Sequence, residues 1–205
     1  MKKKIFIVVL VIIILIAIGC IIKINYTKNI LNKIRDIYTR IIEDKNIYYE
    51  SIRTENNEFT YKMWVKNSKT VAINNGLKYY ADFENKEYYQ QQENELIKVE
   101  DVPILLKNGR ALVNSPGVLV DGQEVDKLSF KNLLIDINIM IENYNGIECY
   151  KIFYGDEITY CDKETLSLIK TITYNEGEVF EVNTYNISFD TVTDEDVDLE
   201  KFKEI

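Results

Sequence analysis

The stretch LLIDINIMIENYNGIECYKIF, residues 133–153, contains the clearest structural signal in the chain. Every second residue from Leu133 to Ile141 is aliphatic, which is the period of a strand with one buried face. Asn145 and Gly146 follow, and this dipeptide favours a two-residue hairpin turn because both positions tolerate positive φ. The stretch therefore predicts an antiparallel hairpin whose first strand begins near Leu133.

Similar hairpins are predicted on both sides of this stretch. Alternating residues and turn dipeptides predict strands at 147–153, 157–161, 166–174 and 179–189. Upstream, residues 59–65 and 71–73 alternate in the same way, and turns are expected at 66–69 and 74–76. Between the two groups, residues 100–112 have helical spacing, and residues 126–132 suit a second short helix. The fold class predicted is α+β, with two antiparallel meanders.

Three pairs of adjacent tyrosines occur in the predicted strands: Tyr48-Tyr49, Tyr79-Tyr80 and Tyr88-Tyr89. Neighbouring residues of a strand point to opposite faces, so both faces of the sheet must accommodate large rings. This favours a curved sheet with helices or a ligand on its concave side. The alternative is that tyrosine is frequent here because it has a high strand propensity and tolerates water.

The amino-terminal residues predict a membrane anchor. After MKKK, residues 5–22 contain no charge, and Lys23 ends the run. A helix of this length is close to the thickness of the hydrocarbon layer of a bilayer. The lysines before it favour an amino terminus in the cytoplasm, with the remaining chain on the outer, extracytoplasmic face of the cell membrane. We expect residues 1–24 to form the anchor or a lipoprotein signal, and residues 25–205 to form one domain.

Ala17-Ile18-Gly19-Cys20 allows a second form of anchor. It is similar to a bacterial lipobox, in which the cysteine is lipidated and becomes the new amino terminus. Isoleucines follow Cys20 where a lipoprotein usually has a polar tether. Lipidation of Cys20 and an uncleaved helix both remain open. In either form, residues 28–44 begin almost where the anchor ends and carry a helical stripe of isoleucine and leucine.

Composition argues against several classes of function. The 33 acidic residues all follow residue 24, whereas four of the 25 basic residues precede it, which leaves 21 basic residues and a formal charge of −12 beyond the anchor. Such a charge disfavours nucleic acid as a partner. The chain has no histidine, so the usual Ser-His and Cys-His nucleophile pairs and the common zinc sites cannot form. We expect no enzyme activity, no cofactor and no metal. The acidic run at residues 194–200 is expected to be solvated and to cap a helix.

Cys149 and Cys161 are expected to form a disulfide, because an extracytoplasmic location is oxidising. A two-residue loop at Gly155-Asp156 would set Cys149 opposite Asp162, so that the two sulfurs leave opposite faces. A three-residue loop that includes Tyr154 would set Cys149 opposite Cys161, at a separation suited to a bridge. The disulfide therefore requires the longer loop.

The order of anchor, helix, meander, helices and second meander resembles the LolA-like family of lipoprotein carriers. The resemblance rests on KMWVKNSKTVAINNGLKYYADFENKEYY and on the carboxy-terminal meander, with its turn Tyr160-Cys161-Asp162-Lys163-Glu164-Thr165 and the later Asn186-Ile187-Ser188-Phe189. It implies a half-barrel, a curved antiparallel sheet with helices covering the concave side. Among family members, the germination-specific lipoprotein of spore-forming anaerobes is closest in character, and it would imply a cell-wall amidase as the partner in spore cortex modification.

Two binding functions follow for such a tethered, non-enzymatic module. In the first, the half-barrel groove holds a lipid acyl chain or a lipidated peptide. In the second, the groove is filled and the protein supports an amidase through an exposed surface. The groove residues expected are Tyr61, Met63, Ile135, Ile137, Ile139 and Ile141, with Ile104, Leu105 and Leu112 as contacts from the covering helix.

Overall fold

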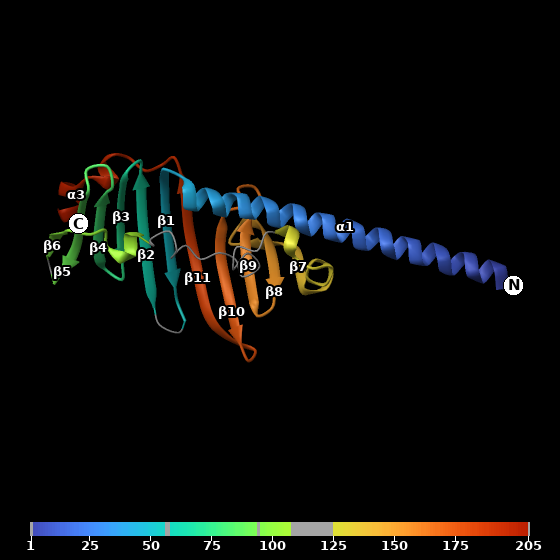
Figure 1. Cartoon of the computed structure of the whole chain (residues 1–205). Helices are drawn as coiled ribbons and strands as arrows, with labels where there is room; N and C mark the ends of the chain where they lie inside the picture. Colours follow the sequence, from blue (N-terminus) through green and yellow to red (C-terminus); the bar gives the residue numbers. More distant parts are fainter. Residues whose placement is uncertain (1, 56–57, 94, 108–124, 205) are drawn as a thin grey trace.

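The computed structural model describes residues 2–55, 58–93, 95–107 and 125–204. The strands pair antiparallel in one curved, open sheet in the order β6-β5-β4-β3-β2-β1-β11-β10-β9-β8-β7 (Figure 1). Each meander follows chain order, and β1 pairs with β11 from Ile47↔Phe189 to Arg53↔Asn183 to join them. The predicted α+β half-barrel is confirmed. Its strands are β1 (Asn46–Arg53), β2 (Phe59–Lys66), β3 (Lys69–Asn74), β4 (Leu77–Asp82), β5 (Glu87–Gln92), β6 (Glu95–Val99), β7 (Ile137–Tyr144), β8 (Ile147–Tyr154), β9 (Glu157–Asp162), β10 (Leu168–Asn175) and β11 (Glu178–Phe189).

The predicted hairpin turns are confirmed where glycine and asparagine mark them. Asn145 and Gly146 have φ values of 52° and 88°, and Asn75 and Gly76 have values of 47° and 82°. These left-handed conformations suit glycine and asparagine. Local residue chemistry therefore sets these two registers.

The first strand of the hairpin predicted within residues 133–153 begins later than expected. Residues Asn132–Asp136 form the π-helical turn η4, and β7 starts only at Ile137. Asn132 N–H donates to Ser129 Oγ at 3.1 Å, and Asn132 Nδ2 donates to Asp136 Oδ2 at 3.1 Å, so local side-chain bonds favour the turn. Ile135 consequently lies outside the sheet. Apart from η4, the 3₁₀ turn η3 (Val125–Lys127) and the short helix α2 (Ile104–Lys107) represent the predicted middle helices in the described residues.

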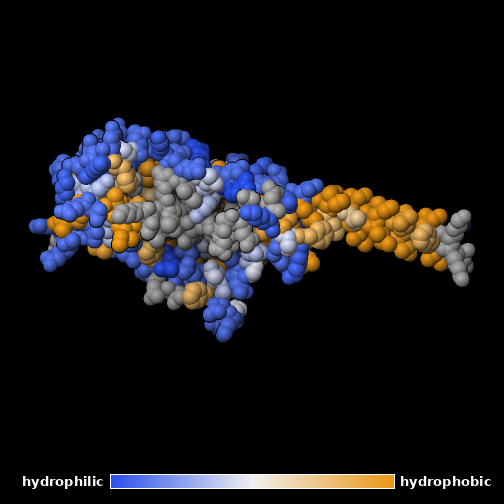
Figure 2. Space-filling view, viewed as in Figure 1, coloured by the Kyte–Doolittle hydropathy of each residue, from blue (hydrophilic) through white to orange (hydrophobic). Residues whose placement is uncertain are grey.

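Helix α1 (Lys2–Glu43) is continuous, so the predicted anchor and the following helix are one element. It is long and apolar enough to cross a membrane. Its first half projects beyond the sheet and exposes apolar side chains all round, whereas its second half lies along the sheet (Figures 1 and 2). The predicted stripe is confirmed, because Ile30, Leu31, Ile34 and Ile41 are buried in the core.

The sheet buries side chains on both faces. One face, here called the α1 face, packs Tyr49, Tyr61 and Met63 against α1. The other face is called the arm face because the C-terminal arm, residues 190–204, covers part of it with η5 (Glu195–Val197) and α3 (Leu199–Glu204). The adjacent tyrosines divide as predicted: Tyr49, Tyr79 and Tyr88 contact the α1-face cluster, whereas Tyr48, Tyr80 and Tyr89 contact the arm-face cluster.

Asp82, buried at the end of β4, is expected to make stability depend on acidic pH. Burial alone would raise its pKa, but hydrogen bonds to Asp82 Oδ1 from the backbone N–H groups of Asn85 and Glu84, both at 3.1 Å, bring the pKa below the ordinary value. Because the pKa of Asp82 is lower in the folded than in the unfolded state, its carboxylate stabilises the folded protein at pH values above the unfolded pKa of about 4. This contribution is lost as the pH falls through the folded-state pKa.

We therefore expect Asp82→Asn to be less stable than the natural protein at pH 7, with a difference that shrinks as the pH is lowered below about 4. Urea unfolding at several pH values measures this. Asp36→Asn is the matched control, because the Asp36 carboxylate is largely exposed on α1. If the difference in unfolding free energy between the natural protein and Asp82→Asn stayed the same at pH values below about 4, the prediction would be contradicted.

Candidate functional site

The expected acyl-chain groove on the α1 face is occupied by the protein itself where the structure describes it. Tyr61, Met63 and Ile137 are fully buried in the cluster that contains Leu31 and Ile34 of α1. Burial raises the pKa of the Tyr61 phenol, which stays neutral at physiological pH. At these three positions the side chains form protein core.

The other expected groove residues do not form one lining. Leu105 and Ile139 are half-buried at the margin of the same cluster. Ile104 and Ile141 are exposed, and Ile135 is 68% exposed on η4. Leu112 lies outside the described residues. The structure thus brings together five of the nine predicted residues, and it leaves three on the surface.

The expected disulfide between Cys149 and Cys161 is absent, and both thiols are free and buried. The β8–β9 hairpin closes through the two-residue loop Gly155-Asp156, so Cys149 pairs with Asp162 and Tyr150 with Cys161. The two sulfurs consequently leave opposite faces of the sheet. The prediction of a bridge was wrong because its register was shifted by one residue. Burial raises the pKa of both thiols, most strongly at Cys161, which makes them weak nucleophiles.

Three free thiols are therefore expected in the purified protein. Intact mass measured with and without reductant should be the same, and alkylation of Cys149 and Cys161 should require unfolding because both are buried. A mass that rises by two hydrogens on reduction would show a bridge and contradict the register.

The arm face carries a groove of about 610 Å³ between the sheet and the C-terminal arm. Its floor is apolar and aromatic, because Trp64 projects from β2, Val71 and Ile73 project from β3, and Phe202 packs down from α3. Tyr80 is buried in the same arm-face cluster, and burial raises its pKa to about 12, so its ring stays neutral beneath the groove. The complete lining of this arm groove is Lys62, Trp64, Val71, Ile73, Glu195, Asp196, Lys201 and Phe202.

Charged groups of both signs surround this apolar floor. Lys62 Nζ lies 2.9 Å from Glu50 Oε1 on the sheet side, and Lys201 Nζ lies 2.9 Å from Glu195 Oε2 on the arm side. The Lys201–Glu195 pair is solvent-accessible, so its attraction is screened and is worth little to stability, whereas Glu50 in the other pair is only 16% exposed. The two pairs leave cations and carboxylates available at the rim for a polar ligand.

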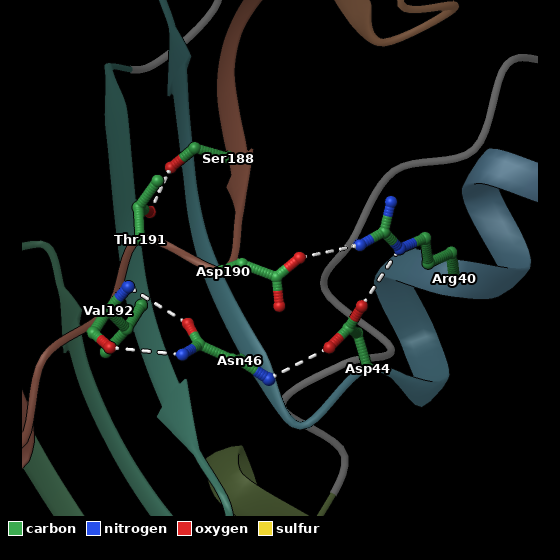
Figure 3. A network of polar contacts seen from close by, with 7 residues as sticks. All are labelled: Arg40, Asp44, Asn46, Ser188, Asp190, Thr191 and Val192. Atoms are coloured by element: carbon green, nitrogen blue, oxygen red, sulfur yellow. Dashed lines mark hydrogen bonds and ion pairs between the residues drawn. The ribbon is translucent and has the colours of Figure 1, made fainter.

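A polar network fixes the start of the arm (Figure 3). Asn46 Nδ2 donates to the Val192 carbonyl at 3.1 Å, and Val192 N–H donates to Asn46 Oδ1 at 2.9 Å. Arg40 donates to Asp44 Oδ2 at 3.0 Å and to Asp190 Oδ2 at 3.1 Å. Since Arg40 belongs to α1 and Asn46 to β1, the network joins α1, the central strand and the arm.

The acidic run caps a helix, as predicted. Asp198 Oδ1 accepts hydrogen bonds from the backbone N–H groups of Glu200 and Lys201, both at 3.0 Å, and the bond from Lys201 is the main cause of its lowered pKa. Within the part of the chain that the structure describes, no group of three or more Cys, Asp and Glu side chains is arranged to hold a metal ion. The arm groove was not predicted, although Val197, Leu199 and Phe202 stand out as apolar residues among the acids.

Neither a protein-family model nor a curated protein sequence matches the chain. Solved structures do resemble its fold. A conserved uncharacterised protein of Thermus thermophilus has 8% identity and a TM-score of 0.42, with 82% of this chain and 90% of that one covered. MucB, which has been solved in complex with MucA from Pseudomonas aeruginosa, has 11% identity and a TM-score of 0.41 in that complex. The match covers 85% of this chain and 62% of MucB. A LolA superfamily protein of Nitrosomonas europaea has 9% identity and a TM-score of 0.28, with 85% and 98% covered.

Proposed function

We propose that this chain is a non-enzymatic, membrane-tethered module on the outer face of the cell membrane, and that it binds a segment of another protein in the arm groove. The burial of Tyr61, Met63 and Ile137 beneath α1 carries the proposal, because it fills the α1 face with protein where an acyl chain was expected. Among the residues that the structure describes, the arm groove offers space for a ligand.

The chemistry of the arm groove suits a peptide segment. Aromatic and aliphatic side chains such as Trp64 and Phe202 form an apolar floor for one or two anchoring side chains, which is the usual arrangement at the centre of a protein interface. Lys62 and Lys201 at the rim are placed to meet acidic groups, and Glu195 and Asp196 to meet basic ones. The family resemblance of the sequence makes a cell-wall amidase the first candidate partner.

The test is a binding titration of the full-length protein in detergent micelles with a purified cell-wall amidase, followed by the fluorescence of Trp64. We expect a saturable change that Lys201→Glu weakens markedly. Lys203→Glu is the matched control, because Lys203 also lies on α3 but does not line the groove. Equal binding by both variants would place the interaction elsewhere, and no binding by the natural protein would remove the amidase as partner.

An acyl-chain ligand is the second candidate, and the margin of the α1-face cluster favours it. Leu105 and Ile139 are half-buried there, and Ile104 and Ile141 are exposed apolar side chains on the same elements. Native mass spectrometry of protein extracted from membranes tests this function. Retained lipid that Ile139→Glu abolishes would support it, whereas lipid-free protein would contradict it.

We further propose that the anchor is uncleaved and that Cys20 is not lipidated. α1 runs without a break through Cys20, and the exposed apolar surface continues through Ile21 and Ile22. An intact mass that corresponds to the full chain supports this form. A mass that begins at Cys20 with added diacylglycerol would show a lipoprotein.

A further inference from the structure

The place where α1 leaves the domain is defined to within five residues. Ile22 is exposed and ends the apolar run, whereas Thr27 is buried against the domain. Between them, Lys23 Nζ donates to the carbonyl of Leu134 at 2.7 Å. The bond fixes η4 directly beside the end of the proposed membrane-spanning segment.

The segment around η4 presents apolar side chains in two directions. Leu128 and Leu133 are buried in the α1-face cluster and hold the segment on the domain. Phe130 and Ile135 point the other way and are 63% and 68% exposed. The hydrogen bond from Asn132 N–H to Ser129 Oγ at 3.1 Å stiffens the turn between them, so the two side chains are presented on a fixed support.

Exposed apolar residues are common, and one alone would need no explanation. Here, however, two large ones lie on a short turn that is bonded to the end of an apolar helix. The adjoining strand β7 exposes Met140 on one face and Ile141 on the other. Lys131 lies between Phe130 and η4, and its side chain is 73% exposed with Nζ 3.6 Å from Asp136 Oδ1. Phe130 and Ile135 thus lie beside the end of the segment that is proposed to enter the bilayer.

We propose that Phe130 and Ile135 insert into the head-group boundary of the same membrane, so that the β7 end of the sheet lies on the bilayer. The occupant is membrane lipid, and the proposal rests on the tether of the proposed function. Because the chain beyond the anchor is strongly acidic, general electrostatic attraction to an anionic surface does not drive the contact. Insertion of the apolar side chains drives the contact instead, and α1 favours it because it holds the domain next to the lipid. The C-terminal arm lies towards the opposite end of the sheet from β7 (Figure 1), so we expect the arm groove to lie away from the lipid.

Three tryptophan reporters test the contact in the full-length chain, in a Trp64→Phe background and reconstituted in nanodiscs with or without brominated lipids. Phe130→Trp reports the proposed contact. Phe83→Trp is the matched control, because Phe83 is also exposed but lies in the turn between β4 and β5, towards the other end of the sheet. Phe6→Trp reports the proposed tether, because Phe6 lies in the apolar half of α1.

We expect brominated lipids to quench Phe130→Trp and Phe6→Trp, with emission shifted to shorter wavelength, and to leave Phe83→Trp unaffected. Quenching of Phe6→Trp without quenching of Phe130→Trp would overturn the lipid contact and leave the tether in place. Failure to quench Phe6→Trp would overturn the tether and the contact with it. Equal quenching of Phe83→Trp and Phe130→Trp would also overturn the proposed orientation.

Discussion

Replacing Leu31 by alanine is expected to lower the free energy of unfolding by about 3 kcal/mol. Leu31 is 0% exposed and lies in the half of α1 that packs on the sheet. Its removal leaves a cavity lined by aliphatic and aromatic side chains that are themselves held by strands, so the site cannot collapse to fill the space. Urea unfolding of the full-length protein in detergent micelles, followed by Trp64 fluorescence, measures the change.

Leu15→Ala provides the matched control in the same helix. Leu15 is 62% exposed in the apolar half of α1, so its truncation removes contact with detergent or lipid and no contact with the domain. We expect a change within about 0.5 kcal/mol. If the two variants were equally stable, α1 would be only an anchor and would not form the core of the domain.

The second large effect is expected from Phe202→Ala in the C-terminal arm. Phe202 is 2% exposed and packs in the arm-face cluster with Val197 and Tyr80. Loss of this ring should lower the free energy of opening the arm by about 3 kcal/mol. The amides of α3 should then exchange with deuterium about a hundredfold faster, whereas those of the central strands should change little.

Phe83→Ala separates loss of the arm contact from loss of any phenylalanine. Phe83 is 43% exposed at the end of β4 and belongs to neither buried cluster. Its truncation should leave α3 exchange unchanged. Faster exchange throughout the sheet of Phe202→Ala would instead mean that the arm and the sheet unfold as one unit. Phe202→Ala should also abolish binding of the partner in the arm groove, because Phe202 is part of the groove lining.

The parts of the fold that were predicted depend on short-range chemistry. Turns at Asn75-Gly76 and Asn145-Gly146 need only a dipeptide that tolerates positive φ, and strand alternation needs only neighbouring residues. The buried stripe of isoleucine and leucine on α1 could likewise be predicted from the spacing of neighbouring residues. These features repeat along the chain, and together they specify a meander without any knowledge of what it packs against.

The incorrect predictions depend on choices that alternation alone does not make. Ile135 continues the strand period of β7, but the bonds between Ser129, Asn132 and Asp136 favour a helical turn there. The cysteine pair depended on one residue of loop length, which reverses the face of every side chain in a strand.

The candidate site was harder to predict than the fold because it depends on contacts between distant parts of the chain. Nothing in the spacing of Val192, Val197 and Phe202 states which face of the sheet they cover. The Asn46–Val192 pair of hydrogen bonds, which fixes the arm, links residues that are 146 positions apart in the chain. The groove between β2, β3 and the arm can therefore be identified only from the folded structure.

The pairing of β1 with β11 also determines when the domain can be completed. β1 is the first strand to be made and β11 is the last, yet they are neighbours at the centre of the sheet. Until Phe189 has emerged, β1 keeps an unpaired edge that other chains could extend. Closing so long a loop costs entropy before any bond is gained, which makes this step slow. The sheet can consequently be completed only after β11 has been synthesised, and a chain truncated before β11 would remain an incomplete, aggregation-prone half-sheet.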